Sequence, residues 1–233
     1  MSFRRRSAER SSDMNYKRIT LICGHYGSGK TNIAVNMAFD LKKQFERVAI
    51  ADLDIVNPYF RTKDSAEELE KAGIRLIVSE YANTNLDIPA LPQEMYAIVD
   101  DKDLVSVVDV GGDDRGAYAL GRLSPAILEE NNYDMFLVIN RFRPLTPDAE
   151  STVGVMREIE QAASLPFTGI IHNSNLGAET TAEDILSSEE YVHAVAALSG
   201  LPVVLTCAEE KVAEQLGDRV SNLFPMHLQK RPV

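Results

Sequence analysis

The residues best suited to chemistry stand close to the amino end of the chain. They are Gly24-His25-Tyr26-Gly27-Ser28-Gly29-Lys30-Thr31, which fit the pattern G-x-x-x-x-G-K-[ST]. Glycines in such a stretch let backbone N–H groups turn inward around an anion, and a helix that begins there adds the positive end of its dipole. In this arrangement Lys30 reaches the β- and γ-phosphates, and the Thr31 hydroxyl is a ligand of Mg²⁺. We therefore predict a phosphate-binding loop at residues 24–31, with Asn32 in the same site.

The segments on both sides of this loop fit the strand, loop and helix order that a phosphate loop requires. Residues 17–23 are dense in β-branched and apolar side chains, and apolar residues recur at helical spacing from Ile33 to Leu41. The alternative is a glycine-rich turn that binds nothing. Lys30 and Thr31 stand where phosphate and metal need them, which favours the phosphate loop.

Two carboxylates, Asp52 and Asp54, end the next apolar segment. Ligands of open α/β sheets bind outside the carboxyl ends of the strands, so both side chains are expected to face the phosphate loop and to bind Mg²⁺. The proline-broken loop at residues 55–62 is consistent with a segment that changes shape with the nucleotide state. For either aspartate the alternative is a solvated helix cap.

A further carboxylate, Asp109, ends the apolar residues 104–108 and precedes a glycine loop. A Mg-nucleotide site needs a carboxylate at a strand end of this kind, and Asp109 is placed to hold Mg²⁺ through water or through Thr31. Gly112 completes a D-x-x-G stretch whose backbone N–H is expected to sense the γ-phosphate. The alternative is an aspartate that caps the following helix.

Asn173 is the candidate for contacting the base. It follows the apolar residues 167–172, and its amide offers both the donors and the acceptor that a purine edge needs. Turn formation explains an asparagine at this position equally well. Neither this loop nor the one that begins at Asn140 contains N-K-x-D, the arrangement by which many GTPases recognise guanine, so adenine is favoured.

Apolar segments alternate with helical patterns along the whole chain. Strands are expected near residues 17–23, 47–54, 75–78, 104–110, 134–139, 167–173 and 202–207. Helices are expected near residues 33–41, 64–72, 117–131, 147–163, 183–198 and 208–216, with Pro125 breaking or restarting the third. A chain of 233 residues, 45% of them hydrophobic, suits one α/β domain. We expect that domain at residues 14–233, and a disordered extension at residues 1–13.

The formal net charge of −11 disfavours binding to nucleic acid or to an anionic membrane surface. No apolar run approaches the length of a membrane helix, and the amino end lacks the hydrophobic segment of a signal peptide, so a cytoplasmic location without a membrane anchor is expected. The two cysteines, Cys23 and Cys207, each end an apolar run and are expected to be buried thiols in a reducing compartment.

With the phosphate loop, D-x-D at residues 52–54 and D-x-x-G at residues 109–112 in this order, the chain resembles the MinD/ParA/CooC-like ATPases of the SIMIBI class of P-loop NTPases. The resemblance implies a mainly parallel sheet of seven or eight strands flanked by helices, Mg-ATP binding, and a change of shape or dimerisation that depends on ATP. It also implies that Asp54 orients the attacking water and that Asp109 and Gly112 belong to a second switch loop. The expected catalytic set is therefore Lys30, Asp54 and Asp109.

The chain departs from that family within the phosphate loop. Its relatives carry K-G-G-x-G-K-T, whose first lysine reaches the partner's nucleotide across a dimer, whereas this chain has His25 followed by Tyr26. A nucleotide-dependent homodimer is therefore one alternative, and a monomeric switch is the other. The cysteines that some relatives use at their dimer interface are absent, which argues against electron transfer and metal-cluster carriage.

Three functions are compatible with these residues. The first, which we favour, is a slow ATPase whose loops change conformation to engage an unidentified protein partner. The second is an ATP-dependent ligase similar to dethiobiotin synthetase or the cobyrinic acid amidases, which needs arginines to bind an anionic substrate. Its candidates are Arg61, Arg115, Arg141 and Arg143. The third is a nucleotide-binding scaffold that hydrolyses almost nothing.

Overall fold

The computed structural model describes residues 15–53, 66–78, 91–112 and 114–228, without the side chains of residues 114 and 115. Every statement below concerns this part of the chain. Asp54, the loop at residues 55–62 and the extension at residues 1–13 lie outside the described residues, and the predictions made for them stay predictions.

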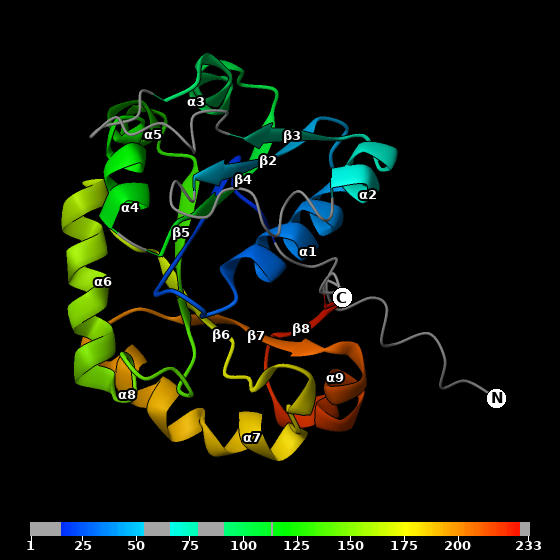
Figure 1. Ribbon diagram of the computed structural model, residues 1–233, viewed down its shortest axis with the longest axis vertical. Helices are drawn as coiled ribbons and strands as arrows, with labels where there is room; N and C mark the ends of the chain where they lie inside the picture. The colour runs from blue at the N-terminus through cyan, green and yellow to red at the C-terminus, as the bar shows by residue number, and fades with distance from the viewer. Residues whose placement is uncertain (1–14, 54–65, 79–90, 113, 229–233) are drawn as a thin grey trace.

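The centre of the molecule is one sheet whose strand pairs are all parallel (Figure 1). The described residues form eight strands in the order β3-β2-β4-β1-β5-β6-β7-β8. Their bounds are β1 Ile19–Cys23, β2 Val48–Leu53, β3 Ile74–Val78, β4 Val105–Val110, β5 Tyr133–Ile139, β6 Gly169–His172, β7 Val203–Glu209 and β8 Leu223–Met226. The central strands β1, β2 and β4 are buried along their whole length, as parallel strands covered on both faces require. The predicted α/β fold with a mainly parallel sheet of seven or eight strands is confirmed.

Helices cover both faces of this sheet. The bounds are α1 Lys30–Lys42, α2 Ala66–Lys71, α3 Ala97–Asp100, α4 Asp114–Gly121, α5 Ser124–Glu130, α6 Ala149–Ala163, α7 Ala182–Ser187, α8 Glu189–Ser199 and α9 Glu210–Leu216. On one face α1 packs against the central strands through Ile33, Met37 and Leu41. On the other face α4, α6 and α8 lie next to one another and bury residues such as Leu120 and Met156 (Figure 1). The phosphate loop therefore joins the middle strand of the sheet to the main helix of one face.

The short helix α3 was not predicted, and two further elements differ from the sequence prediction. The single helix expected at residues 183–198 is two helices, because Ser188 separates α7 from α8. The Ser188 hydroxyl donates to the Ile185 carbonyl and lies 2.8 Å from Nε2 of the buried His172, so it competes with the helical backbone pattern. Strand β8 was not predicted, because Pro225 interrupts its pattern. Strand β8 lies at the edge of the sheet, where one side of the backbone has no neighbouring strand. A proline, which lacks the backbone N–H, is tolerated there because no hydrogen bond to a neighbour is lost on that side.

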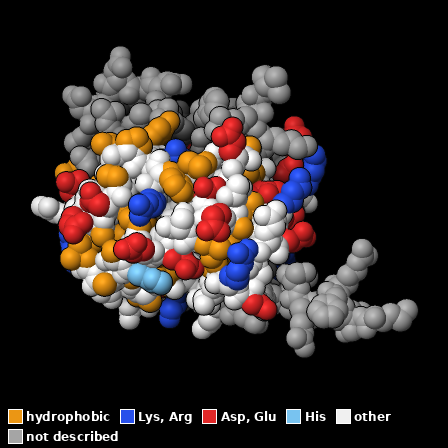
Figure 2. Space-filling model, turned by 90° about the horizontal axis from the view of Figure 1, so that it is seen from below, with side chains coloured by type: hydrophobic (Ala, Val, Ile, Leu, Met, Phe, Trp, Pro, Cys, Tyr) orange, Lys and Arg blue, Asp and Glu red, His pale blue; other side chains and the backbone are white. Residues whose placement is uncertain are grey.

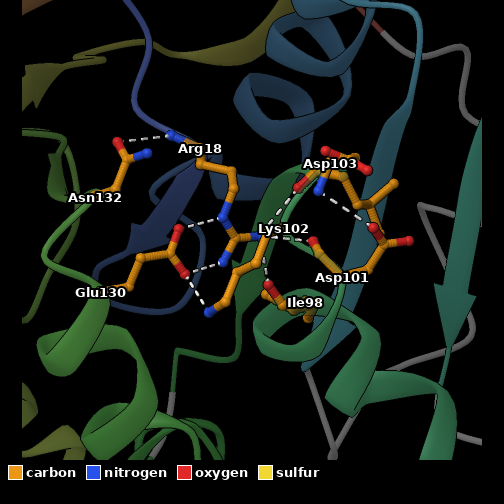
Figure 3. Close-up of polar contacts among 8 residues, drawn as sticks. Arg18, Ile98, Asp101, Lys102, Asp103, Glu130 and Asn132 are labelled. Carbon is orange, nitrogen blue, oxygen red and sulfur yellow. Dashed lines mark hydrogen bonds and ion pairs between the residues drawn. The ribbon is translucent and has the colours of Figure 1, made fainter.

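The amino end of β1 is held by the side chain of Arg18, which is 7% exposed (Figure 3). Its guanidinium forms a bidentate ion pair with Glu130 at the end of α5 and donates to three backbone carbonyls. These are Ile98 at 2.8 Å, Asp101 at 3.2 Å and Leu104 at 3.1 Å. The hydrogen bonds from Arg18 hold the pKa of Glu130 down at about 2. The cluster fixes β1 from the end of the sheet opposite to the phosphate loop.

The surface of the molecule carries charges of both signs. On the face shown in Figure 2, Lys and Arg side chains are scattered among acidic and hydrophobic ones, so the described residues visible there form no basic patch of the kind that nucleic-acid binding needs. None of the helices in the described ranges is long and apolar enough to cross a membrane.

Candidate functional site

The predicted phosphate loop connects β1 directly to α1, and its glycines are required by both conformation and space. Gly24 and Gly29 have φ angles of 144° and 96°, which L side chains rarely adopt. A Cβ at Gly24 would lie 2.5 Å from the Val138 carbonyl oxygen of β5, and one at Gly29 would lie 2.2 Å from Nδ2 of Asn173. The loop therefore packs against β5 and the residue that follows β6, and these neighbours limit the conformations that its backbone can adopt.

Lys30 is the first residue of α1, and its side chain turns back over the loop. Its ammonium group donates to the carbonyl of His25 at 3.2 Å, and the residue is 7% exposed. The His25 ring nitrogen Nδ1 lies 3.1 Å from the carbonyl oxygen of Tyr26, whose own side chain is 67% exposed. The cation predicted to bind phosphate thus spans the loop that is predicted to surround the phosphate.

Thr31 and Asp109 come together across the carboxyl end of the sheet. The Thr31 hydroxyl donates to Oδ2 of Asp109 at 2.6 Å, from the first turn of α1 to the carboxyl-terminal part of β4. Asp52 is the register partner of Asp109 on β2, and both are nearly inaccessible, at 3% and 2% exposed. Residues paired in a parallel register present their side chains to the same face, so Asp52 shares the face on which Asp109 meets α1. The structure brings both aspartates to the predicted metal site.

Gly112 lies against the phosphate loop. A Cβ at this position would be 2.6 Å from the backbone nitrogen of Tyr26 and 2.9 Å from the ammonium nitrogen of Lys30. These distances leave no room for any side chain. The D-x-x-G turn that follows β4 is therefore in direct contact with the loop and with its lysine.

Asn173 has a role that sequence reasoning missed. It is 3% exposed, and its Nδ2 donates to the Ser28 carbonyl in the phosphate loop at 2.7 Å. Asn175 in turn donates from Nδ2 to the Asn173 carbonyl at 2.8 Å. Two asparagines that follow β6 thus brace the phosphate loop, Asn173 directly and Asn175 through the Asn173 carbonyl. The predicted contact between Asn173 and the base stays a prediction, and the donor group of its amide already has a partner in the loop.

The predicted site residues that the structure describes therefore lie at the carboxyl ends of β1, β2, β4 and β6 and at the start of α1. They are Gly24, His25, Tyr26, Gly27, Ser28, Gly29, Lys30, Thr31, Asn32, Asp52, Asp109, Gly112 and Asn173. The carbonyl oxygen of Asn32 accepts a hydrogen bond from Nδ2 of Asn36, one turn further along α1. Asp54 lies outside the described residues.

The donor groups in the site fit Mg²⁺ bound together with a phosphate. Within the described ranges no three His, Cys, Asp or Glu residues form a metal-binding group. Mg²⁺ characteristically takes one or two protein ligands, with phosphate oxygens and water supplying the others. A threonine hydroxyl held by a buried carboxylate satisfies this requirement.

Two buried titratable residues next to the site are inert. Burial raises the pKa of the Cys23 thiol far above its usual range, with Lys30 acting weakly in the opposite direction, so this cysteine stays protonated. Burial lowers the pKa of His172 to about 4, so the ring is neutral at physiological pH and serves as a hydrogen-bonded core residue. Cys207 is likewise buried and forms no disulfide.

A glycine loop between a central parallel strand and a helix, with Lys30 folded over it and Thr31 held by Asp109, defines a P-loop nucleotide-binding domain. The CobQ/CobB/MinD/ParA nucleotide binding domain family matches residues 19–186, well over half of the chain. The chain belongs to this family. The resemblance inferred from the three motifs is therefore confirmed. The comparison with curated proteins gave no match.

Solved structures with the same fold include three FtsY proteins. The cell division protein FtsY of Thermotoga maritima has a TM-score of 0.53 at 18% identity, with 83% of this chain and 62% of that chain covered. The chloroplast FtsY of Physcomitrella patens has a TM-score of 0.55 at 19% identity, covering 81% and 57%. FtsY from Mycoplasma mycoides has a TM-score of 0.53 at 18% identity, covering 88% and 67%. The chain spans about three fifths of the first two proteins, and the likeness establishes the fold.

Proposed function

We propose that this chain is a Mg²⁺-dependent ATP-binding protein that hydrolyses ATP slowly and changes shape to engage a protein partner. The observation that carries the proposal is the hydrogen bond of 2.6 Å between the Thr31 hydroxyl and Asp109, beside a lysine folded over the phosphate loop. The Thr31–Asp109 pair suits the metal of a Mg-bound triphosphate, and the Lys30 ammonium group suits its phosphates.

Each residue has a distinct role in the proposed reaction. Lys30 binds the terminal phosphates and offsets the charge that develops as the outer bond breaks. Thr31 would be the direct ligand of Mg²⁺, while Asp109 orients that hydroxyl and Asp52 adds negative charge on the same face. Bound Mg²⁺ would supply charge neutralisation on the phosphate oxygens. The resemblance to MinD-like ATPases assigns the positioning of the attacking water to Asp54.

The switch is proposed to lie in the turn that carries Gly112. Because Gly112 contacts both the loop backbone and the ammonium group of Lys30, a phosphate bound there must touch or displace this turn. The turn leads directly into α4, whose Tyr118 is 64% exposed. Large apolar side chains exposed near a moving element are suitable contacts for a protein partner. The absence of N-K-x-D favours adenine over guanine.

Binding is tested by calorimetric titration of the full chain with ATP and with GTP, each with Mg²⁺. Lys30→Ala should weaken ATP binding by two orders of magnitude or more, since it removes a buried charge-assisted contact to phosphate. Lys71→Ala, which removes the same charge from a side chain 77% exposed on α2, is the matched control and should change nothing. Absence of ATP binding by the parent protein would overturn the proposal, and tighter binding of GTP would overturn its adenine part.

The switch and the hydrolysis are tested separately. Hydrogen exchange of the amides at residues 110–121 should be slower with a non-hydrolysable triphosphate than with the diphosphate. Light scattering in the same two nucleotide states then distinguishes a dimer from a monomer. Equal exchange in the two states contradicts the switch. Asp54→Ala should bind ATP with nearly the parent affinity but release no phosphate, and unchanged turnover would remove Asp54 from the mechanism.

A further inference from the structure

Arg143 approaches the phosphate loop from the side opposite to Asp109 and Gly112. In the sheet order, β1 lies between β4 and β5. Asp109 and Gly112 belong to the end of β4, whereas Arg143 follows β5. The loop that leaves β1 therefore has the metal-binding threonine and its aspartate on one flank and an arginine on the other.

The guanidinium of Arg143 rests on the loop at Gly27. A Cβ at Gly27 would lie 3.5 Å from Nε of Arg143 and 3.7 Å from its Cδ and Cζ, which is ordinary van der Waals contact. Nε is buried and has no hydrogen-bond partner in the described part of the chain. Buried polar groups are paired in the great majority of cases, so an unpaired charged donor of this kind calls for a ligand.

A second unpaired polar atom lies in the phosphate loop itself. The Ser28 hydroxyl is buried, with the residue 2% exposed, and among the described residues it has no hydrogen-bond partner. Ser28 follows Gly27 directly, and its carbonyl is the group that Asn173 holds. Two buried donors without partners among the described residues thus lie at neighbouring points of the site: the Ser28 hydroxyl within the phosphate loop, and Nε of Arg143 against Gly27.

The backbone around Arg143 is fixed without any ligand. The Arg143 nitrogen donates to the Asn140 carbonyl, and the Thr146 nitrogen donates to the Arg143 carbonyl, both at 3.2 Å. Asn140 is completely buried, and its Oδ1 accepts from the backbone nitrogen of Phe142 at 3.0 Å. The arginine is therefore presented to the loop by a turn anchored at the end of β5, so little ordering is needed when it binds.

We propose that Arg143 is a nucleotide-binding residue that donates hydrogen bonds to a phosphate shared by nucleoside diphosphates and triphosphates. This inference rests on the proposed function. The terminal phosphate is expected where Lys30 and Gly112 meet, on the β4 flank. Arg143 lies against the loop on the other flank, at Gly27, which stands three residues before Lys30. The inner part of the phosphate chain would pass there. A guanidinium suits this position because its planar donors match phosphate oxygens in pairs.

The experiment measures the affinity of the full chain for Mg-ADP and for a Mg-bound non-hydrolysable ATP analogue. Arg143→Ala should weaken both by the same factor, roughly 10- to 100-fold, because a charge-assisted hydrogen bond common to both ligands is lost. At saturating ATP the turnover number should stay near the parent value, because the lost hydrogen bond stabilises bound ATP and the transition state equally. Arg143→Lys should recover part of the affinity. Arg141→Ala removes the same charge from an exposed position of the same turn and should leave both affinities unchanged.

Thermal unfolding without nucleotide separates ligand binding from a structural role. Arg143→Ala should unfold at nearly the parent temperature, because the lost Nε has no partner within the described structure. A large drop in that temperature, unchanged affinities, or a loss confined to the triphosphate would each overturn the assignment of Arg143 while leaving the proposed function standing. If the parent protein binds neither nucleotide, the proposed function fails and this assignment fails with it.

Discussion

The hydroxyl of Thr31 donates a hydrogen bond of 2.6 Å to Asp109, a residue 78 positions further along the chain. The contact joins the first turn of α1 to the end of β4, two elements that meet only because β4 lies beside β1 in the sheet. It fixes the direction in which the hydroxyl donates its proton. The site therefore depends on the order of the strands as much as on its motifs.

Loss of the carboxylate at Asp109 should impair Mg²⁺ binding. Asp109→Asn keeps the size of the side chain but removes the charge that orients the Thr31 hydroxyl, so the apparent Mg²⁺ affinity in the presence of nucleotide should fall about 10- to 100-fold. Thr31→Ser, which retains the hydroxyl, should stay close to the parent. Titrating Mg²⁺ against phosphate release or calorimetric binding measures both variants. An unchanged Mg²⁺ requirement in Asp109→Asn contradicts this assignment.

A methyl group at position 112 should disturb the site. In Gly112→Ala the new Cβ would meet the Tyr26 nitrogen and the Lys30 ammonium group, so the turn or the loop must shift. We expect a loss of about 1–3 kcal/mol in the free energy of unfolding, together with weaker nucleotide binding. Gly154→Ala on α6 is the control, since nothing lies within 4 Å of its Cβ, and it should stabilise the protein by about 0.5–1 kcal/mol. Denaturant unfolding monitored by circular dichroism measures both.

Replacement of Asn173 should show whether this residue reads the base. If its amide only braces the Ser28 carbonyl, Asn173→Ala weakens ATP and GTP binding by the same factor, because the loop loses a hydrogen bond worth about 1 kcal/mol. If the residue contacts the base, the ratio of the two affinities changes. Parallel calorimetric titrations with both nucleotides measure that ratio. We expect it to stay constant, and a shift of tenfold or more would favour base recognition.

The ion pair between Arg18 and Glu130 should make stability depend on pH in the acid range. The folded-state pKa of Glu130 is about 2, below its usual value of 4.5, so the contribution of the pair is complete above pH 4.5 and is lost as the pH falls toward 2. Glu130→Gln should cost about 1–3 kcal/mol at pH 7, because Arg18 loses the charged partner of its bidentate ion pair.

The difference between Glu130→Gln and the parent should shrink between pH 4.5 and pH 2, as followed by denaturant unfolding at each pH. Lys102→Met is the control. Lys102 contacts the same carboxylate at 2.7 Å but is 60% exposed, so its removal should cost less than about 1 kcal/mol. A difference between Glu130→Gln and the parent that stays constant across this range would show that the charge of Glu130 does not stabilise the fold.

The local patterns predicted most elements, and the exceptions have physical reasons. Pro125 was expected to break or restart a helix, and it stands in the first turn of α5. Backbone N–H groups in the first turn have no acceptor within the helix, so the missing N–H of proline costs nothing there. The division of residues 183–198 at Ser188 depends on the hydrogen bond between the Ser188 hydroxyl and His172, which belongs to β6. Helical periodicity cannot predict a contact with a residue of a strand. The same holds for β8, whose pairing with β7 overrides a weak pattern.

The sequence by itself determined the phosphate loop, the carboxylates at strand ends and the class of fold, because these depend on residue type and short spacing. The tertiary structure alone decided that Asn173 holds the Ser28 carbonyl, that Gly112 touches Lys30, and that Arg143 rests on Gly27. Each of these contacts joins the loop after β1 to the end of another strand. Their partners are set by the order of strands in the sheet, which arises from packing of the whole chain and leaves no trace in local spacing.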